Sequence, residues 1–136
     1  MSLVIAVDIG GTHIRVAAYE PDQTTPVKHQ RVPSEGLKPG VFDRLVQAVE
    51  AVWPADGDVT AIGMAVPGAL DLHQGIILNT PNILEWQNFP VGPKLAERFG
   101  VPVYLNNDAN LAALGEWKYG AGRGHDDLLY LTISTG

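Results

Sequence analysis

The sequence predicts an α/β domain in which helices flank a mixed, open sheet. Short apolar segments rich in β-branched residues recur along the chain, and segments with a helical period stand between the later ones. Polar residues follow several of these segments where each predicted strand ends, which is where open α/β sheets bind their ligands. A length of 136 residues and a hydrophobic fraction of 46% are sufficient for one globular domain with its own core.

The first half of the chain contains four strand-like segments and one helical segment. In chain order we expect strands at residues 3–9, 13–19 and 27–32, a helix at 41–53 and a strand at 59–66. The first three strands follow one another closely, so we expect an antiparallel meander. In the helix, Asp43, Arg44 and Glu50 fall largely opposite the apolar face, and we attach packing but no chemistry to this segment.

The second half is expected to add a hairpin, two helices and two strands. These are the hairpin at residues 69–72 and 75–78, a helix at 93–99, a strand at 101–105, a helix beginning near 108 and a last strand at 127–134. The glycine-rich segment 118–124 lacks the Gly-Lys-Ser/Thr ending of a P-loop and is interpreted as a helix stop and loop. Because Ser134-Thr135-Gly136 has the pattern of a strand followed by a turn, we expect a continuation beyond it.

Composition and charge exclude several classes of function. Nine Lys and Arg against fifteen Asp and Glu give a net charge of −6, which disfavours binding to nucleic acid or to an anionic membrane surface. The absence of cysteine removes disulfides and thiolate metal sites and agrees with a cytoplasmic location. Asp8 interrupts the apolar start of the chain, so neither a signal peptide nor a membrane span is expected.

The segment from Asp8 to Thr12 is the first candidate ligand site. Its glycines, Gly10 and Gly11, permit the positive φ angles of a tight hairpin, and they leave room for backbone N–H groups to approach an anion. A simple Gly-Gly turn would explain the pair in isolation. The neighbours favour a phosphate site, because Asp8 can hold hydrated Mg²⁺ while Thr12 and the N–H groups meet phosphate.

A second candidate site lies between the strand at 101–105 and the helix that follows. Asn106, Asn107 and Asp108 stand there in succession, whereas one Asn or Asp is enough to cap a helix. Asp108 is therefore either an N-cap or a catalytic carboxylate. The roles can also be divided, with Asn106 or Asn107 as the cap and Asp108 facing a cleft.

A third candidate is the polar segment from Asn79 to Trp86, which includes Asn82. Polar residues mixed with an aromatic residue are typical of sugar-binding loops, although a surface loop with Trp86 turned inward fits equally well. Gly68, at the end of the strand at 59–66, allows a ligand to approach the backbone closely.

In this order the motifs resemble those of the ROK family, whose members are bacterial sugar kinases and sugar-responsive repressors. The resemblance runs along nearly the whole chain. Asp8-Ile9-Gly10-Gly11-Thr12 is similar to the family's first phosphate loop, and Ala65-Val66-Pro67-Gly68 is similar to its second strand-end signature. Asn79-Thr80-Pro81-Asn82 with Trp86 resembles the sugar-proximal loop, and Asn107-Asp108-Ala109-Asn110 resembles the catalytic segment. Thr132-Ile133-Ser134-Thr135-Gly136 resembles the start of the second phosphate loop.

The resemblance implies a ribonuclease H-like lobe of the actin-like ATPase and hexokinase class, with ATP-dependent phosphorylation of a hexose. Asp108 would be the general base, and the sugar contacts would come from Asn107, Asn82, Asp108 and the backbone at Gly68. The transferring phosphate would meet Gly10, Gly11 and Thr12, with Thr135 and Gly136 opposite and Asp8 holding Mg²⁺ through water. His13 departs from the family pattern, because many relatives carry Lys there.

The resemblance also implies that residues 1–136 are a single amino-terminal lobe. We expect the carboxyl-terminal lobe, a zinc motif within it and most of a homodimer interface to lie beyond Gly136, and the isolated lobe to be inactive. The alternative is the sugar-sensing domain of a ROK repressor. Repressors of the family carry a helix-turn-helix segment ahead of the first phosphate loop, and the short distance from Met1 to Asp8 favours the kinase. A non-enzymatic actin-like ATPase module is disfavoured by Asn82 and Asn107-Asp108.

Overall fold

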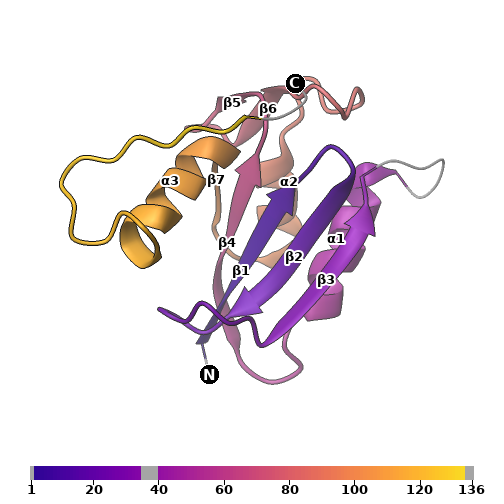
Figure 1. Ribbon diagram of the computed structural model, residues 1–136. Helices are drawn as coiled ribbons and strands as arrows, with labels where there is room; N and C mark the ends of the chain where they lie inside the picture. Colours follow the sequence, from indigo (N-terminus) through magenta and orange to yellow (C-terminus); the bar gives the residue numbers. More distant parts are fainter. Residues whose placement is uncertain (1, 35–39, 134–136) are drawn as a thin grey trace.

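The computed structural model describes residues 2–34 and 40–133 of the chain and shows an α/β fold (Figure 1). Thr135 and Gly136, which the sequence assigns to a second phosphate loop, lie outside the described residues. The elements in chain order are β1 (Ser2–Ile9), β2 (His13–Tyr19), β3 (Lys28–Pro33), α1 (Val41–Val52), β4 (Asp58–Val66), β5 (Ala69–Asp71), β6 (Ile76–Asn79), α2 (Val91–Phe99), β7 (Val103–Asn107) and α3 (Asp108–Tyr119).

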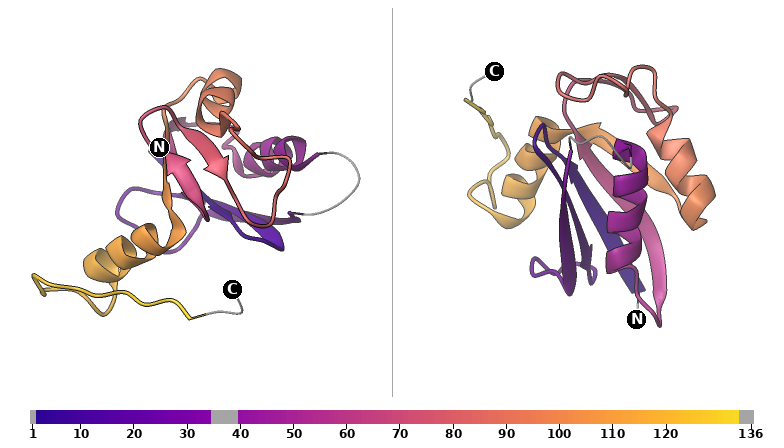
Figure 2. Two further views of the ribbon diagram at one scale, coloured as in Figure 1. Left: turned by 90° about the horizontal axis from the view of Figure 1, so that it is seen from above. Right: turned by 90° about the vertical axis from the view of Figure 1, so that its right-hand side faces the viewer.

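Five strands form one mixed sheet in the order β3-β2-β1-β4-β7. β1, β2 and β3 pair antiparallel, as the predicted meander requires, whereas β4 pairs parallel to β1 and to β7. Strands β5 and β6 form a separate two-stranded hairpin. Figure 2 shows α1 and α2 on one side of the large sheet and α3 on the other. The carboxyl ends of β1, β4 and β7 therefore meet at one edge of the sheet.

The core lies between this sheet and the helices α1 and α2. In β1 every second side chain is buried, which is the period of two expected for a strand with one covered face. The apolar stripe of α1 covers that face. The fully buried side chains of this layer include Ile5, Ile9, Ile14, Val16, Leu45, Val49, Val52, Ile62 and Met64.

Two features of the helices differ from the sequence prediction. α2 begins at Val91, so Pro93 is its third residue; proline is tolerated there because N–H groups of the first turn have no intrahelical acceptor. Arg44, predicted on the polar face of α1, is 8% exposed. Its guanidinium donates to the carbonyls of Pro33 and Ser34, which provide the polar partners that a buried charge needs.

The strand predicted at residues 127–134 is wrong for the part that the structure describes. Residues 127–133 have no regular structure, and Leu129, Leu131 and Ile133 are 82%, 73% and 95% exposed. A β-strand is stable only when a neighbouring strand pairs with its N–H and C=O groups, and within the described residues no strand pairs with this segment. Local β-propensity alone was therefore insufficient.

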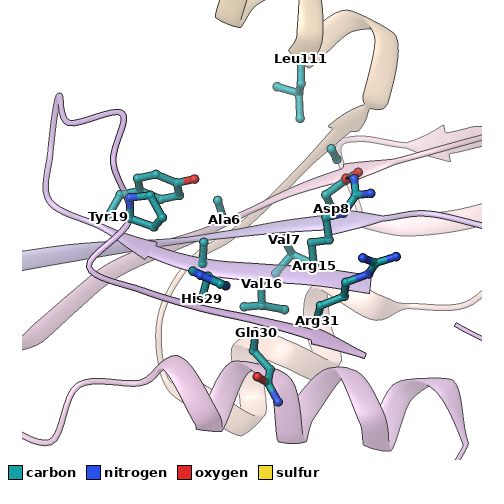
Figure 3. Close-up of a pocket in the computed structure, with 13 residues that line it drawn as sticks. Ala6, Val7, Asp8, Arg15, Val16, Tyr19, His29, Gln30, Arg31 and Leu111 are labelled. Atoms are coloured by element: carbon teal, nitrogen blue, oxygen red, sulfur yellow. Dashed lines mark hydrogen bonds and ion pairs between the residues drawn. The ribbon is translucent and has the colours of Figure 1, made fainter. Parts of the chain in front are cut away.

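α3 covers its side of the sheet only loosely. None of its twelve residues is buried. Its last turn is tied to the β2–β3 turn, where Lys118 Nζ lies 3.4 Å from Asp22 Oδ1. Between α3 and the sheet is an open cavity of about 670 Å³, lined in part by the small side chains of Ala6 and Ala17. Figure 3 shows Leu111 of α3 on the opposite side of this cavity from Ala6. No helix of the described ranges is both long and apolar enough to cross a bilayer.

Candidate active site

Two carboxylates that are far apart in the sequence meet at the carboxyl edge of the parallel strands. The strand register places Asp8 beside Ala65 of β4, and Ala65 beside Asn106 of β7. Asp8 and Asp108 both line a cavity of about 230 Å³. Tyr130 and Thr132 of the following segment complete its wall. The larger cavity beneath α3 also includes Asp8 but is otherwise mainly apolar, so the smaller cavity is the candidate site for chemistry.

Asp8 forms an ion pair with Arg15 of β2. The Arg15 Nη1 and Asp8 Oδ2 atoms are 3.3 Å apart, and Figure 3 shows the two side chains next to each other. They are 65% and 48% exposed, and ion pairs of such exposure contribute at most about 1 kcal/mol. The Asp8 carboxylate is thus free to exchange this partner for another cation.

The turn from β1 to β2 requires glycine for space. The Gly10 amide donates to the His13 carbonyl at 2.9 Å, and a Cβ on Gly10 would come within 2.7 Å of that same oxygen. Neither Gly10 nor Gly11 has a positive φ, so the turn does not use the left-handed conformation that glycine permits. Glycine is needed at Gly10 because the His13 carbonyl approaches so closely, and the approach of the N–H groups to an anion stays a prediction.

The segment from the end of β6 into the following loop packs against the turns that follow β1 and β4. A Cβ on Gly11 would lie 2.5 Å from the side-chain amide of Asn82, so these two residues are in contact. Gly68 has φ +94°, and a Cβ there would lie 2.1 Å from the Asn79 carbonyl oxygen. Gly11 therefore lies against Asn82 in this loop, and Gly68 lies against Asn79 at the end of β6, where the loop begins.

Trp86 anchors that loop from the inside. It is 1% exposed, and its ring stacks on Phe89 with centroids 5.3 Å apart. The orientation of Trp86, which the sequence left open, is therefore inward, while sugar binding by the polar residues of the loop stays a prediction. The aromatic ring stabilises the loop that carries Asn82 and does not face a ligand.

The polar run before α3 divides its roles. Asn107 is the N-cap, and its Oδ1 accepts from the Ala109 amide at 3.0 Å. Asn106 Oδ1 accepts from the Asn107 amide and from the side chain of Asn110. Asp108 also accepts from the Ala109 amide, at 2.8 Å, but its exposed side chain lines the cavity with Asp8. Capping therefore does not depend on Asp108 alone.

Ser34 and Arg44 belong to this region but carried no functional signal in the sequence. Ser34, which directly follows β3, donates hydrogen bonds to the carbonyl groups of Gly10 and Thr12. Arg44 holds the Ser34 carbonyl from α1. Thr12 itself is exposed beside the turn. No local pattern marks a serine that bonds a turn more than twenty residues away, and helical periodicity alone placed Arg44 in solvent.

The family model of the ROK family matches residues 4–136. This chain belongs to the ROK family. A relative, the glucokinase of Thermotoga maritima, is 38% identical over 135 residues, which are 98% of this chain and 42% of the relative. The xylose repressor of Caldicellulosiruptor bescii is 35% identical over 96 residues, covering 71% of this chain and 24% of the repressor.

A solved ROK structure shows the same fold. The ROK glucokinase from Streptomyces griseus, crystallised in complex with glucose and AMPPNP, matches with a TM-score of 0.79 and 36% identity over 92% of this chain and 39% of that one. The predicted ribonuclease H-like, actin-like fold is thereby confirmed. The chain spans about two fifths of the length of the glucokinases that it matches.

Proposed function

We propose that this chain is the amino-terminal lobe of an ATP-dependent hexose kinase of the glucokinase type. The observation that carries the proposal is the shared cavity of Asp8 and Asp108, which the sheet register assembles from opposite ends of the sequence. One carboxylate beside a phosphate-binding turn and a second at a helix start provide the two functions that phosphoryl transfer requires, which are charge neutralisation and positioning of the attacking hydroxyl.

The turn after β1 supplies the phosphate contacts in this proposal. The Gly11 and Thr12 amides donate to no other residue in the described part of the chain, so both are available to phosphate oxygens. A chain with net charge −6 can bind an anion in this way because backbone dipoles replace a basic patch. Thr135 and Gly136 are proposed to contact phosphate from the opposite side.

Asp108 acts as the general base. It accepts the proton of the attacking sugar hydroxyl, an effect typically worth about 10²–10⁴-fold in rate. Asn107, Asn82 and the backbone at Gly68 hold the neighbouring hydroxyl groups. Asn82 is brought to the phosphate turn by its contact with Gly11, which supports a sugar and a phosphate bound side by side.

Magnesium fits the residues present. Mg²⁺ is usually bound by one or two carboxylates together with substrate phosphates and water, and Asp8 is a carboxylate in this cavity, two residues ahead of the proposed phosphate-binding turn. Asp8 would hold the ion through water. When bound, Mg²⁺ neutralises phosphate charge. The Arg15 side chain, now paired with Asp8, would then be released toward solvent.

The relatives support the same activity. Glucokinases from Thermotoga maritima and Streptomyces coelicolor align along 98% and 100% of this chain. We further propose that the complete protein is a cytoplasmic homodimer that binds neither nucleic acid nor membranes, and that its carboxyl-terminal lobe carries any zinc site. The isolated lobe is expected to be inactive, because sugar and ATP bind between two lobes.

A second candidate is the sugar-sensing domain of a repressor, which the similarity to xylose repressors favours. The two functions make different demands on Asp108. A kinase requires its carboxylate for turnover, whereas a sensor requires only that the sugar bind.

A hexose panel with MgATP, assayed on the complete product of the gene and on its Asp108→Asn variant, tests the proposal. We expect phosphorylation of at least one hexose, and a loss of about 10²–10⁴-fold in kcat in the variant. The 136-residue chain assayed alone should show no turnover. Tight sugar binding without phosphate transfer by the complete protein would favour the sensor instead.

A further inference from the structure

Two buried polar side chains lie next to the β1–β2 turn without a part in the proposed chemistry. Ser34 is 1% exposed and Arg44 is 8% exposed. Burying a hydroxyl or a guanidinium is unfavourable unless each finds hydrogen-bond partners. Both side chains donate to backbone carbonyls. These hydrogen bonds connect α1, through Ser34, to the turn that we propose binds phosphate.

Ser34 holds the turn at two points. Its Oγ donates to the Gly10 carbonyl at 2.5 Å, and its amide donates to the Thr12 carbonyl at 2.9 Å. One residue thus bonds the carbonyls on both sides of Gly11.

The first of these bonds also orients an N–H group. The Gly10 carbonyl and the Gly11 N–H belong to the same planar trans peptide, in which they point in opposite directions. Because the Gly10 carbonyl points toward Ser34, the Gly11 N–H points away from it. That N–H, which donates to no other described residue, is therefore directed to the side of the turn opposite the core.

Arg44 in turn holds Ser34. Its Nε donates to the Pro33 carbonyl at 3.0 Å, and its Nη2 donates to the Ser34 carbonyl at 2.9 Å. The planar guanidinium fixes two successive carbonyls at the end of β3, which a lysine with a single ammonium group cannot do with the same geometry. α1, to which we attached no chemistry, is thereby connected to the turn.

We propose that Ser34 and Arg44 are positioning residues of the phosphate-binding turn. Arg44 fixes the backbone of Ser34, and Ser34 fixes the two carbonyls of the turn so that the Gly11 N–H is directed to the phosphate before ligand binds. The proposal rests on the proposed function, in which this turn binds the phosphates of ATP. A turn that is already ordered binds more tightly because less conformational entropy is lost on binding.

The test compares Ser34→Ala and Arg44→Lys with the control Thr60→Val. The Thr60 hydroxyl also donates to a backbone carbonyl, that of Leu3, at 3.2 Å, but at the opposite end of β1 from the turn. The control therefore removes the same kind of hydrogen bond without touching the turn. Thermal melts first identify the variants that remain folded.

Two readouts separate positioning from general stability. The first is the ¹⁵N order parameter of Gly11 and Thr12 in the 136-residue chain without ligand. We expect it to fall from about 0.85 to below about 0.6 in Ser34→Ala and Arg44→Lys, and to stay unchanged in Thr60→Val. The second is the Kd for MgAMPPNP of the complete gene product, which should rise about tenfold in the first two variants only.

Unchanged order parameters in Ser34→Ala and Arg44→Lys would overturn the proposal. So would a mobile turn with unaltered MgAMPPNP affinity, or an equal loss of affinity in Thr60→Val. If the proposed function is wrong, the unaltered protein itself will not bind MgAMPPNP. In that case the order parameters alone decide whether Ser34 positions the turn.

Discussion

Gly11 lies against Asn82, so that a Cβ on Gly11 would come within 2.5 Å of the Asn82 side-chain amide. The contact joins the turn after β1 to the loop after β6. At the adjacent Gly10, the atom in the way is the backbone carbonyl of His13, at 2.7 Å. A side-chain end can rotate aside, whereas a carbonyl that accepts a hydrogen bond within the turn cannot move without breaking it.

Alanine is therefore expected to act differently at these two glycines. Gly11→Ala should displace Asn82 and weaken hexose binding while changing the free energy of unfolding by less than about 1 kcal/mol. Gly10→Ala should destabilise the protein by about 1–3 kcal/mol through overpacking of the turn. Urea denaturation and calorimetric sugar titration measure the two effects. Equal losses of stability in both variants would contradict this interpretation.

Substitutions at Asp108 and at Asn107 should distinguish a role in catalysis from a role in capping α3. Asp108→Asn is expected to reduce kcat of the complete enzyme by about 10²–10⁴-fold with little change in stability, because the Asn107 cap is retained. Asn107→Ala removes the cap and should lower the free energy of unfolding by about 0.5–2 kcal/mol. Steady-state kinetics and thermal melts of the two variants provide the check. Normal turnover in Asp108→Asn would exclude it as the base.

Gly63 lies within β4, and Gly68 lies just after the end of the same strand. Alanine should have opposite effects on the free energy of unfolding at these two positions. At Gly68, with φ +94° and the Asn79 oxygen 2.1 Å from the Cβ position, alanine is expected to destabilise by at least about 2 kcal/mol. At Gly63, no described atom lies within 4 Å of the Cβ position. Alanine there should stabilise the strand by about 0.5–1 kcal/mol. A Gly68→Ala variant as stable as the unaltered protein in chemical denaturation would contradict the close approach of Asn79 to this turn.

Trp86 should be essential for the loop that presents Asn82. Trp86→Ala is expected to lower the free energy of unfolding by about 3–5 kcal/mol, because a buried ring stacked on Phe89 is lost. Leu84, in the same loop but 79% exposed, is the matched control, and Leu84→Ala should stay within about 0.5 kcal/mol of the unaltered protein. Guanidinium melts of both variants test the difference.

The Lys118–Asp22 ion pair between α3 and the β2–β3 turn should be lost in alkali, when the Lys118 ammonium loses its proton. Hydrogen bonding and charge interaction with Tyr119, and then with Asp22, raise the pKa of Lys118 above its ordinary 10.5. A raised pKa in the folded state means that the stabilisation is complete below 10.5 and disappears as pH rises through the folded-state value. NMR titration of the Lys118 ammonium should show this raised pKa, and Asp22→Asn should bring it closer to 10.5. An unchanged pKa in Asp22→Asn would show that Asp22 makes no contribution.

Local pattern was sufficient where the neighbours in sequence decide the structure. The apolar run of β1, the alternation in β2 and the apolar stripe of α1 predicted two strands and a helix, and each is present. The polar residues before Asp108 allowed a cap other than Asp108, and Asn107 is that cap. The glycines at the first turn were also recognised, although the reason was space and not positive φ. These features depend on rotation about a few bonds and on side chains a few residues apart.

Features that depend on distant neighbours could not be predicted in this way. The segment 127–133 has strand-like composition but no pairing partner among the described residues, and Arg44 has a surface-like place in its helix but a buried one in the fold. The orientation of Trp86 stayed open for the same reason, since burial depends on what packs against the ring.

The sequence by itself determined the α/β class, the resemblance to the ROK family and the identity of most candidate site residues. Only the tertiary structure decided that Asp8 and Asp108 line one cavity, that Asn82 touches Gly11 and that Ser34 holds the β1–β2 turn. The physical reason is that strand register and side-chain packing join residues far apart in the chain. Hydrophobic period and turn propensity, in contrast, are properties of residues next to one another.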